Sequence, residues 1–213
     1  MERRKFFKVA GAGATLALFD IFSKGSLAGQ GSPIILENFP VYKQETPFTC
    51  GPSSVRMTLE FLGHPLPEKD IARRMGTKKM IGTSHGMLIR AYRKYLAELE
   101  TGFTVEKITG KAATEDAVES SLKQGLPIIA SFLTENHFKP GTSVGHYCVI
   151  IGIDREKKEF TLANPFGYKE SIGIDHFWRL AEWNPGPGDI PGVKNPKILP
   201  FRLPRTLVVL EKN

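Results

Sequence analysis

Cysteine is scarce in this sequence, with only Cys50 and Cys148 among its 213 residues. A small domain held together by disulfides needs several cysteines, so that class of protein is excluded. One bridge between the two cysteines stays open as an alternative. Hydrophobic residues make up 41% of the chain, which is enough for one ordinary domain with a core of its own.

A dense basic stripe with interleaved aromatic residues is also missing. The formal net charge is +7, but residues 1–28 carry five of the 29 lysines and arginines and two of the 22 acidic residues, so the rest of the chain carries +4. This modest excess gives little support for nucleic-acid binding. We therefore expect no nucleic-acid partner.

The histidines lack metal-ligand spacing, so we expect neither zinc nor another cofactor. Four of them are scattered singly along the chain: His64, His85, His137 and His176. His85 directly follows the stretch Gly82–Ser84 and is a candidate to line a cleft.

No apolar run near the N-terminus is long enough to cross a membrane comfortably. The run Val9–Phe22 is rich in alanine and glycine and is interrupted by Asp20. It follows the basic segment Arg3–Lys8 and precedes Ser26–Ala28, which places small residues at the two positions that a signal peptidase reads. Together these features predict an export signal over residues 1–28.

The basic segment Arg-Arg-Lys-Phe-Phe-Lys resembles a twin-arginine signal, whose cargo is exported already folded. We expect cleavage near Ala28 and a mature domain of residues 29–213 in the periplasm or outside the cell. The twin-arginine machinery and signal peptidase would be its partners, and stable membrane insertion of the mature chain is not expected. A basic amphipathic N-terminal helix and an uncleaved anchor are the alternatives.

Cys50 lies where the sequence predicts the start of a helix. Pro52 fits a first helical turn, and residues then recur at the spacing of one buried helical face: Val55, Thr58, Leu59 and Leu62. The partial positive charge at a helix N-terminus stabilises a thiolate, which is the nucleophilic form of cysteine. Gln44, six residues upstream, carries a neutral amide donor. This layout is typical of a thiol nucleophile and its oxyanion hole. A buried, inert Cys50 at a tight turn and a loop-capping Gln44 are the alternatives.

Helical patterns dominate the first half of the chain and strand patterns the second, which predicts an α+β domain. Helices are expected from Cys50 to Gly63, from about Glu68, after an N-cap at Ser84, from Thr114 to Gly125, and over 176–183. Strands are expected over 103–108, 127–133, 146–154, 159–163, 169–174 and 205–210, with a long irregular connection over 184–200. The antiparallel sheet would form the second lobe.

Two polar residues stand at the ends of neighbouring predicted strands. His146 opens one strand, and Asn164 ends the next strand of the hairpin, just before Pro165. Antiparallel pairing brings the start of one strand beside the end of the next, so Asn164 can reach His146. Such a histidine accepts the thiol proton and later protonates the leaving amine, while the third residue orients the ring. A hydrogen-bonded structural histidine and an ordinary turn-forming asparagine are the alternatives.

Several short motifs in this order resemble the bacteriocin-leader (double-glycine) cysteine peptidase family and its stand-alone relatives in the papain-like superfamily. The matching segments, between about residue 40 and about residue 180, are Gln44, Phe48–Ser54, Gly82-Thr83, Gly145–Tyr147 and Ala163–Pro165. The resemblance implies a papain-like fold with the nucleophile helix in an N-terminal helical lobe and the His/Asn pair in a C-terminal antiparallel sheet.

The same resemblance implies a role for each candidate residue. Cys50 would be the nucleophile, His146 the base and Asn164 the orienting residue, while Gln44 and the backbone N–H of Cys50 would form the oxyanion hole. The family usually carries Asp where this chain has Asn164, and Asn is the residue that papain uses. The sequence shows no transporter membrane segment, so the leader-peptide substrate is not carried over.

These observations predict an exported cysteine hydrolase that cleaves a peptide or amide bond of a peptide or protein substrate through a thioester intermediate. Acyl transfer of the transglutaminase-like kind and a catalytically silent peptide-binding domain are the alternatives. Cys148 is expected to be a small core residue on the same strand face as His146. A Cys50–Cys148 disulfide is its alternative in an oxidising compartment.

Overall fold

A computed structural model describes residues 32–79, 81–135, 143–182 and 204–213. The chain divides into two units, Met1–Gln30 and Gly31–Asn213, and the described residues all belong to the second. The predicted export signal, His137 and the irregular connection over 184–200 lie outside the described residues.

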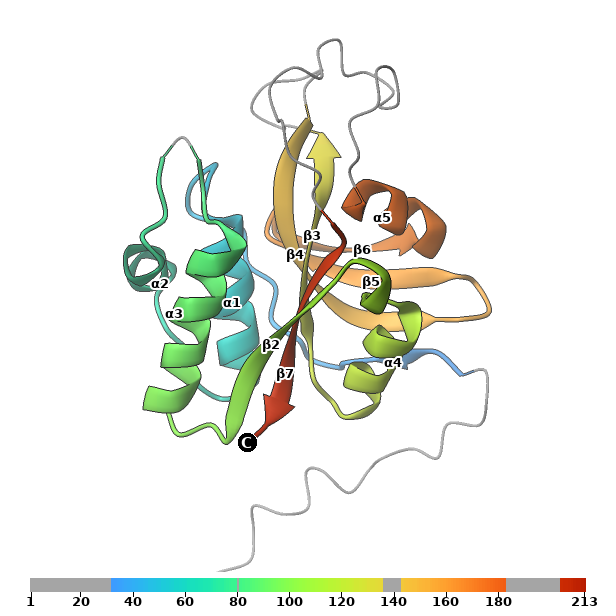
Figure 1. The fold of residues 1–213 in the computed structure, drawn as a ribbon, viewed down its shortest axis with the longest axis horizontal. Coiled ribbons are helices and arrows are strands. Elements are labelled where there is room, and N and C mark those ends of the chain that lie inside the picture. The colour runs from blue at the N-terminus through green and yellow to red at the C-terminus, as the bar shows by residue number, and fades with distance from the viewer. Residues whose placement is uncertain (1–31, 80, 136–142, 183–203) are drawn as a thin grey trace, which may run out of the picture. The chain divides into compact units, whose positions relative to one another are not determined.

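The described unit is an α+β fold, as the sequence predicts. Figure 1 shows one group of helices on one side of an antiparallel sheet and a second group on the other side. The first group consists of α1 (Cys50–Phe61), α2 (Glu68–Met75) and α3 (His85–Glu98), and the second of α4 (Glu115–Lys123) and α5 (Ile174–Ala181). None of the described helices is long and apolar enough to span a bilayer.

Seven strands of the described residues form the sheet. They are β1 (Ile34–Ile35), β2 (Phe103–Thr109), β3 (Ile128–Glu135), β4 (Ser143–Asp154), β5 (Glu159–Asn164), β6 (Tyr168–Gly173) and β7 (Thr206–Lys212). Their order is β2-β7-β3-β4-β5-β6, and β1 pairs with the far end of β4. The C-terminal strand β7 thus separates β2 from β3, which the sequence pattern alone does not predict.

The side chains at the predicted helix starts explain why these helices begin where they do. Ser84 Oγ accepts a hydrogen bond from the backbone N–H of Met87 at 3.3 Å, and Thr114 Oγ1 accepts one from Ala117 at 3.2 Å. Each bond satisfies a backbone donor that has no partner within its helix. The predicted N-cap at Ser84 and the predicted helix start at Thr114 are confirmed.

Two predicted boundaries near the site are wrong. Strand β4 begins at Ser143 rather than at His146, because β3 extends to Glu135 and pairs with β4 from Ser143 onward. His146 therefore lies inside the strand. Helix α5 begins at Ile174 instead of residue 176, since the Ile174 side chain is buried in the core.

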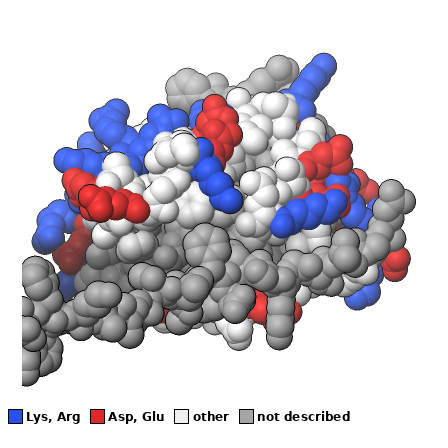
Figure 2. All heavy atoms as spheres, turned by 90° about the horizontal axis from the view of Figure 1, so that it is seen from below, with Lys and Arg blue, Asp and Glu red and all other residues white. Residues whose placement is uncertain are grey.

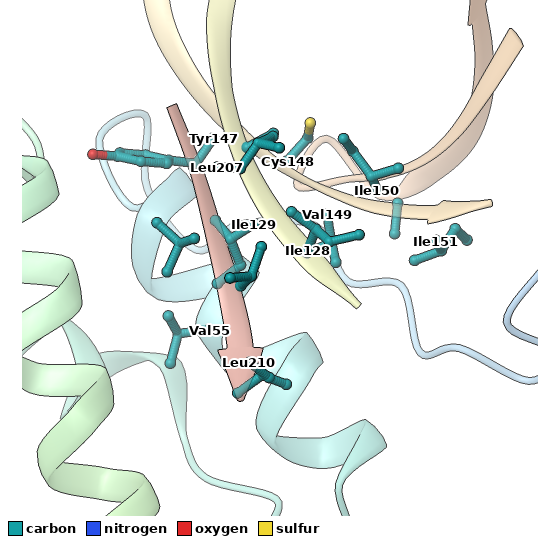
Figure 3. Close-up of a cluster of buried hydrophobic side chains, with 14 of the residues drawn as sticks. Val55, Ile128, Ile129, Tyr147, Cys148, Val149, Ile150, Ile151, Leu207 and Leu210 are labelled. Atoms are coloured by element: carbon teal, nitrogen blue, oxygen red, sulfur yellow. The ribbon is translucent and has the colours of Figure 1, made fainter. Parts of the chain in front are cut away.

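Helix α1 is central to the core, and its first two turns are buried on nearly every side. The predicted inward residues Val55, Thr58 and Leu59 are fully buried, whereas Leu62 is only half-buried. Figure 3 shows Val55 facing the sheet, beside residues of β3 and β7 that include Ile129. Burying such aliphatic side chains contributes about 1.5–3 kcal/mol each, so the sheet holds the start of α1 firmly in place.

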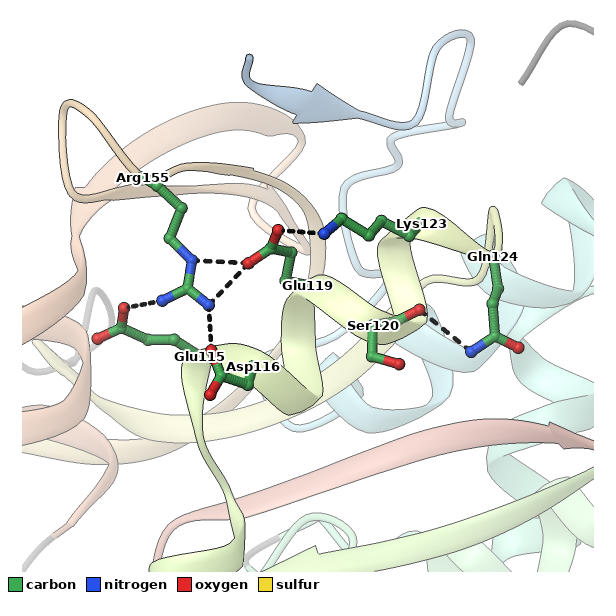
Figure 4. Close-up of polar contacts among 7 residues, drawn as sticks. All are labelled: Glu115, Asp116, Glu119, Ser120, Lys123, Gln124 and Arg155. Atoms are coloured by element: carbon green, nitrogen blue, oxygen red, sulfur yellow. Dashed lines mark hydrogen bonds and ion pairs between the residues drawn. The ribbon is translucent and has the colours of Figure 1, made fainter. Parts of the chain in front are cut away.

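An ion-pair network on the other side ties the β4–β5 hairpin to α4 (Figure 4). Arg155, in the predicted hairpin turn, contacts Glu115 and Asp116 at 2.5 Å and Glu119 at 2.7 Å. Lys123 joins the network through Glu119 at 2.6 Å. These partly exposed pairs are screened by water and salt, so they fix the hairpin's position more than they stabilise the fold.

Candidate active site

Cys50 is the first residue of α1, at the helix start that the sequence predicts. The preceding loop is held by Thr49, whose Oγ1 exchanges hydrogen bonds with Thr46 at 3.1 Å. Gly51 packs closely against Thr83: a Cβ placed on Gly51 would lie only 3.2 Å from the Thr83 Cβ. The motif Cys50-Gly51 thus needs glycine for the close approach of the loop that precedes α3.

Burial raises the pKa of the Cys50 thiol above its ordinary value. The backbone N–H groups of Tyr147, Gly51 and Cys50 act in the opposite direction, and the negative charge of Glu68 raises the pKa further. The expected helix-terminus effect is therefore present in the amides of Cys50 and Gly51, but desolvation outweighs it. The net pKa of the Cys50 thiol is thus raised, although the helix N-terminus by itself acts to lower it, as the sequence predicts.

His146 lies in β4, paired with Phe132 of β3, and its side chain is 3% exposed. The imidazole is stacked on the Phe166 ring with centroids 4.5 Å apart and an interplanar angle of 11°. The Phe132 ring meets it edge-on at 5.7 Å. These two aromatic rings hold the imidazole plane and exclude water from its faces.

Asn164, the last residue of β5, lies beside His146. The Oδ1 atom of Asn164 is 3.0 Å from Nε2 of His146. Because this oxygen is only an acceptor, the bond places the ring proton on Nε2 and leaves Nδ1 as the basic nitrogen of the neutral ring. The sequence expectation that the hairpin brings these two residues together agrees with this contact.

Two further contacts fix which way the Asn164 amide points. Its Oδ1 also accepts a hydrogen bond from the backbone N–H of Phe166 at 3.0 Å. Its Nδ2 donates to Oε1 of Glu170 on β6 at 2.5 Å. A flipped amide would place a donor against the Phe166 N–H and an acceptor against the carboxylate, so the orientation is determined on both sides.

Gln44 is buried and lies next to the turn that carries Asn164. Its backbone N–H donates to the carbonyl of Pro165 at 2.7 Å, and its Nε2 donates to the carbonyl of Thr46 at 2.6 Å. Oε1 of Gln44 has no hydrogen-bond partner among the described residues. Since an amide nitrogen carries two hydrogens, Nε2 can also donate to a substrate oxygen.

A buried carboxylate supports this loop from behind. Glu68, the first residue of α2, is fully buried, and its Oε1 accepts the backbone N–H of Glu45 at 2.8 Å. Its charge acts on Cys50, as described above. Glu68 thus contacts the loop that carries Gln44, and its charge raises the pKa of the Cys50 thiol.

Cys50 and Cys148 are separate thiols in this structure. Figure 3 shows Tyr147 and Cys148 on opposite faces of β4, as strand alternation requires. Cys148 is fully buried, and burial raises the pKa of its thiol well above the ordinary value. The predicted place of Cys148 in the core is confirmed, and Cys148 forms no disulfide with Cys50 in this structure.

His85 lies beside this site rather than in a metal site. Its Nε2 is 2.9 Å from Oγ of Ser131, and its ring packs edge-on against Tyr147 with centroids 5.4 Å apart. Burial, together with the charge of Lys107, lowers the pKa of His85 to about 4. Among the described residues, no group of three or more His, Cys, Asp or Glu side chains is placed to hold a metal ion.

The family comparison adds to this geometry. The model of the Peptidase_C39 like family matches residues 36–184, which is more than half of the chain and includes Cys50, His146 and Asn164. The chain belongs to the peptidase C39-like family. Membership in this family identifies the chain as a cysteine-type peptidase.

Solved C39 peptidases share the fold of this C39-like chain at low identity. A C39-like peptidase from Bacillus anthracis has a TM-score of 0.57 and 16% identity over 85% of this chain and 99% of that one. The peptidase domain of Streptococcus ComA, a bifunctional ABC transporter of a quorum-sensing pathway, has a TM-score of 0.54 and 16% identity over 82% and 99%.

A third structure is a double-glycine motif protease from an AMS/PCAT transporter in complex with its leader peptide. It has a TM-score of 0.50 and 14% identity, and it covers 82% of this chain and 91% of that one. No curated protein matches this chain. These likenesses describe the fold.

Sequence reasoning missed three residues of this candidate site: Glu170, Phe166 and Glu68. Glu170 lies on the same face as Asn164 because β5 and β6 pair with Leu162 opposite Glu170. This pairing register was the available signal, since the predicted strands 159–163 and 169–174 would place the two residues diagonally if they paired as a hairpin. Phe166 and Glu68 reach the site through a turn and a distant helix, for which the sequence offers no comparable pattern.

Proposed function

We propose that this chain is an exported peptidase that hydrolyses peptide or amide bonds with a Cys50–His146–Asn164 triad. The observation that carries the proposal is the 3.0 Å bond from His146 Nε2 to Asn164 Oδ1, with the amide held in one orientation by Glu170 and Phe166. A histidine fixed in a single tautomer is what a thiol nucleophile requires of its base.

In the proposed first step, Sγ of Cys50 attacks the substrate carbonyl carbon while Nδ1 of His146 accepts the thiol proton. The raised pKa of Cys50 gives this base its task, because the resting thiol keeps its proton until a base removes it. Asn164 stays hydrogen-bonded to Nε2 and stabilises the imidazolium that forms.

The developing oxyanion would receive the backbone N–H of Cys50 and Nε2 of Gln44. The Gln44 loop is positioned for this by its bonds to Pro165, Thr46 and Glu68. Removing one such donor in other enzymes lowers kcat by about 10²–10³-fold. When the oxyanion collapses, the C–N bond breaks, His146 protonates the amine, and a thioester on Cys50 remains.

Water then completes the cycle. His146 accepts a proton from the water that attacks the thioester carbonyl, the carbon–sulfur bond breaks, and the proton returns to the thiolate. The acid product leaves and the resting pair is restored. Apart from the attacking water, every reacting group in these steps belongs to the chain or the substrate, so the proposed reaction requires no cofactor.

Export is the second part of the proposal and depends on residues 1–28 alone. The twin-arginine-like basic segment, the short apolar run and Ser26–Ala28 support transport of the folded domain and cleavage near Ala28. The substrate would then be a peptide or protein met outside the cytoplasm. Intact mass of the protein from a periplasmic fraction, with and without an Arg3→Lys/Arg4→Lys change, tests this part.

The chemical part is tested by reacting the full chain with iodoacetamide and by offering it a peptide library, both read by mass spectrometry. We expect selective alkylation of Cys50, with the deeply buried Cys148 as an internal reference, and slower alkylation in His146→Ala. Library peptides should be cut by the native chain and not by Cys50→Ser. An intact library together with an unreactive Cys50 would contradict the proposal, and amine incorporation in place of hydrolysis would redirect it to acyl transfer.

A further inference from the structure

A basic groove lies between α3 and β2. It has a volume of about 620 Å³ and is open to solvent. Its lining consists of Gly86, Ile89, Arg90, Arg93, Lys94 and Lys107. Every charged residue of this lining is a cation.

The α3 residues of the groove follow the helical repeat, so they form one stripe along the helix. From Gly86 to Lys94 the stripe is about 12 Å long, which matches about four residues of an extended peptide. Arg93 is anchored in the groove because its Nε donates to the carbonyl of Val105 on β2 at 2.7 Å. This bond uses one of the five guanidinium donors.

The charges of the groove are only weakly compensated by acidic neighbours. Lys94 lies 3.9 Å from Glu98, which also pairs with Arg74. The ion pairs found among the described residues include no partner for Arg90, Arg93 or Lys107.

The nearest acid along β2 faces away from the groove. Glu106 points to the opposite face of the strand from Lys107, where it lies beside Glu211 of β7. On the left of Figure 2, the side on which α2 and α3 lie in Figure 1, Lys and Arg gather with a smaller group of acidic residues. Glu106 and Glu211 therefore lie across β2 from the groove cation Lys107.

A chain of contacts leads from the groove to the nucleophile. The groove begins at Gly86, one residue after His85. The charge of Lys107, another groove residue, helps to lower the pKa of His85. The His85 ring packs on Tyr147, and the backbone N–H of Tyr147 lowers the pKa of the Cys50 thiol by hydrogen bonding. The hydroxyl of Tyr147 also donates to the carbonyl of Thr83, which packs against Gly51.

We propose that this groove binds an acidic stretch of the peptide substrate, about four residues long, on one side of the bond to be cleaved. The inference rests on the proposed function for the position of that bond. The largely buried Ile89 also lines the groove and offers an apolar contact beside the cations. Substrates with Asp or Glu at these positions are then selected over their amide counterparts.

Binding is tested separately from catalysis by fluorescence anisotropy with the full chain carrying Cys50→Ala. The probes are two fluorescein-labelled peptides that differ only in a run of four Glu or four Gln. We expect the Glu peptide to bind at least about tenfold more tightly at low salt, and the difference to shrink toward 0.15 M salt because exposed charges are screened over about 8 Å.

The variant pair Arg90→Gln/Lys107→Gln should bring the Glu peptide down to the affinity of the Gln peptide. The matched control Lys69→Gln/Lys111→Gln removes the same charge from exposed positions outside the groove and should retain the preference. Equal binding of the two peptides, or equal loss in both variant pairs, would overturn the proposal. Tighter groove-dependent binding of a labelled ten-residue oligothymidine would overturn it in favour of a nucleic acid.

The alkylation of Cys50 described above distinguishes the two proposals. A reactive Cys50 and a cleaved library without any acidic preference would remove only the groove proposal. An inert Cys50 in a chain that still binds the Glu peptide through Arg90 and Lys107 would remove the proposed hydrolysis and leave an acidic-peptide binding domain.

Discussion

The side-chain amide of Asn164 donates its Nδ2 hydrogen to the Glu170 carboxylate at 2.5 Å. Asn164 thus stands between His146 and a negative charge, with its oxygen toward the imidazole and its nitrogen toward β6. The family that this chain resembles usually has Asp at this position. In this chain the carboxylate belongs to Glu170 instead, and the Asn164 amide lies between it and the His146 imidazole.

Removing the Glu170 carboxylate should therefore affect catalysis through Asn164. A hydrogen bond to a charged group contributes about 1.5–3 kcal/mol, which corresponds to a roughly tenfold to hundredfold loss of kcat in Glu170→Ala. Glu170→Gln keeps an acceptor for Asn164 Nδ2 and should retain most of the rate. Steady-state kinetics on a cleaved library peptide measure both variants, and equal losses would show that charge rather than orientation matters.

Asn164→Asp should be harmful in this chain although the related family uses Asp. The new carboxylate would lie within hydrogen-bond distance of Glu170, and like charges this close repel strongly. We expect a lower midpoint of urea unfolding at pH 7 and recovery in the double variant Asn164→Asp/Glu170→Gln. The coupling energy should be about 1–3 kcal/mol in a double-mutant cycle, and additive effects would contradict this account.

Glu68→Gln should shift the pH dependence of Cys50 alkylation to lower pH. The Glu68 charge raises the pKa of the Cys50 thiol, so a neutral amide allows the thiolate to form at lower pH. The Gln oxygen can still accept the Glu45 N–H and preserve the loop. Asp70→Asn on the same helix is the matched control, because Asp70 is paired with Arg73 at the surface and should leave the profile in place.

Gly152→Ala should destabilise the fold without touching the site. A Cβ at Gly152 would lie 2.7 Å from Ile35 Cδ1 and 2.8 Å from the Ile34 carbonyl oxygen, where β1 pairs with β4. Such overpacking costs about 1–3 kcal/mol, measurable as a lower urea midpoint. Gly173→Ala has open space around the new methyl group and should change the midpoint far less.

Local sequence patterns were enough to predict the helix that starts at Cys50, the α+β class and the hairpin that brings the side chains of His146 and Asn164 together. Each of these follows from local rules, because helical period, N-caps and strand alternation involve residues close along the chain. The same local reasoning predicted that Cys148 is a core residue, which the structure confirms. The family motifs are short segments of this kind.

The electrostatics and the surroundings of the site depend on how distant segments pack. The net pKa of Cys50 depends on desolvation and on Glu68, which belongs to another helix, so the local helix-terminus argument accounts only for the part that lowers this pKa. The position of β7 between β2 and β3 and the packing of α3 against β2, which forms the basic groove, also depend on tertiary structure. Burial and charge act through space, so only the packing of distant segments determines them.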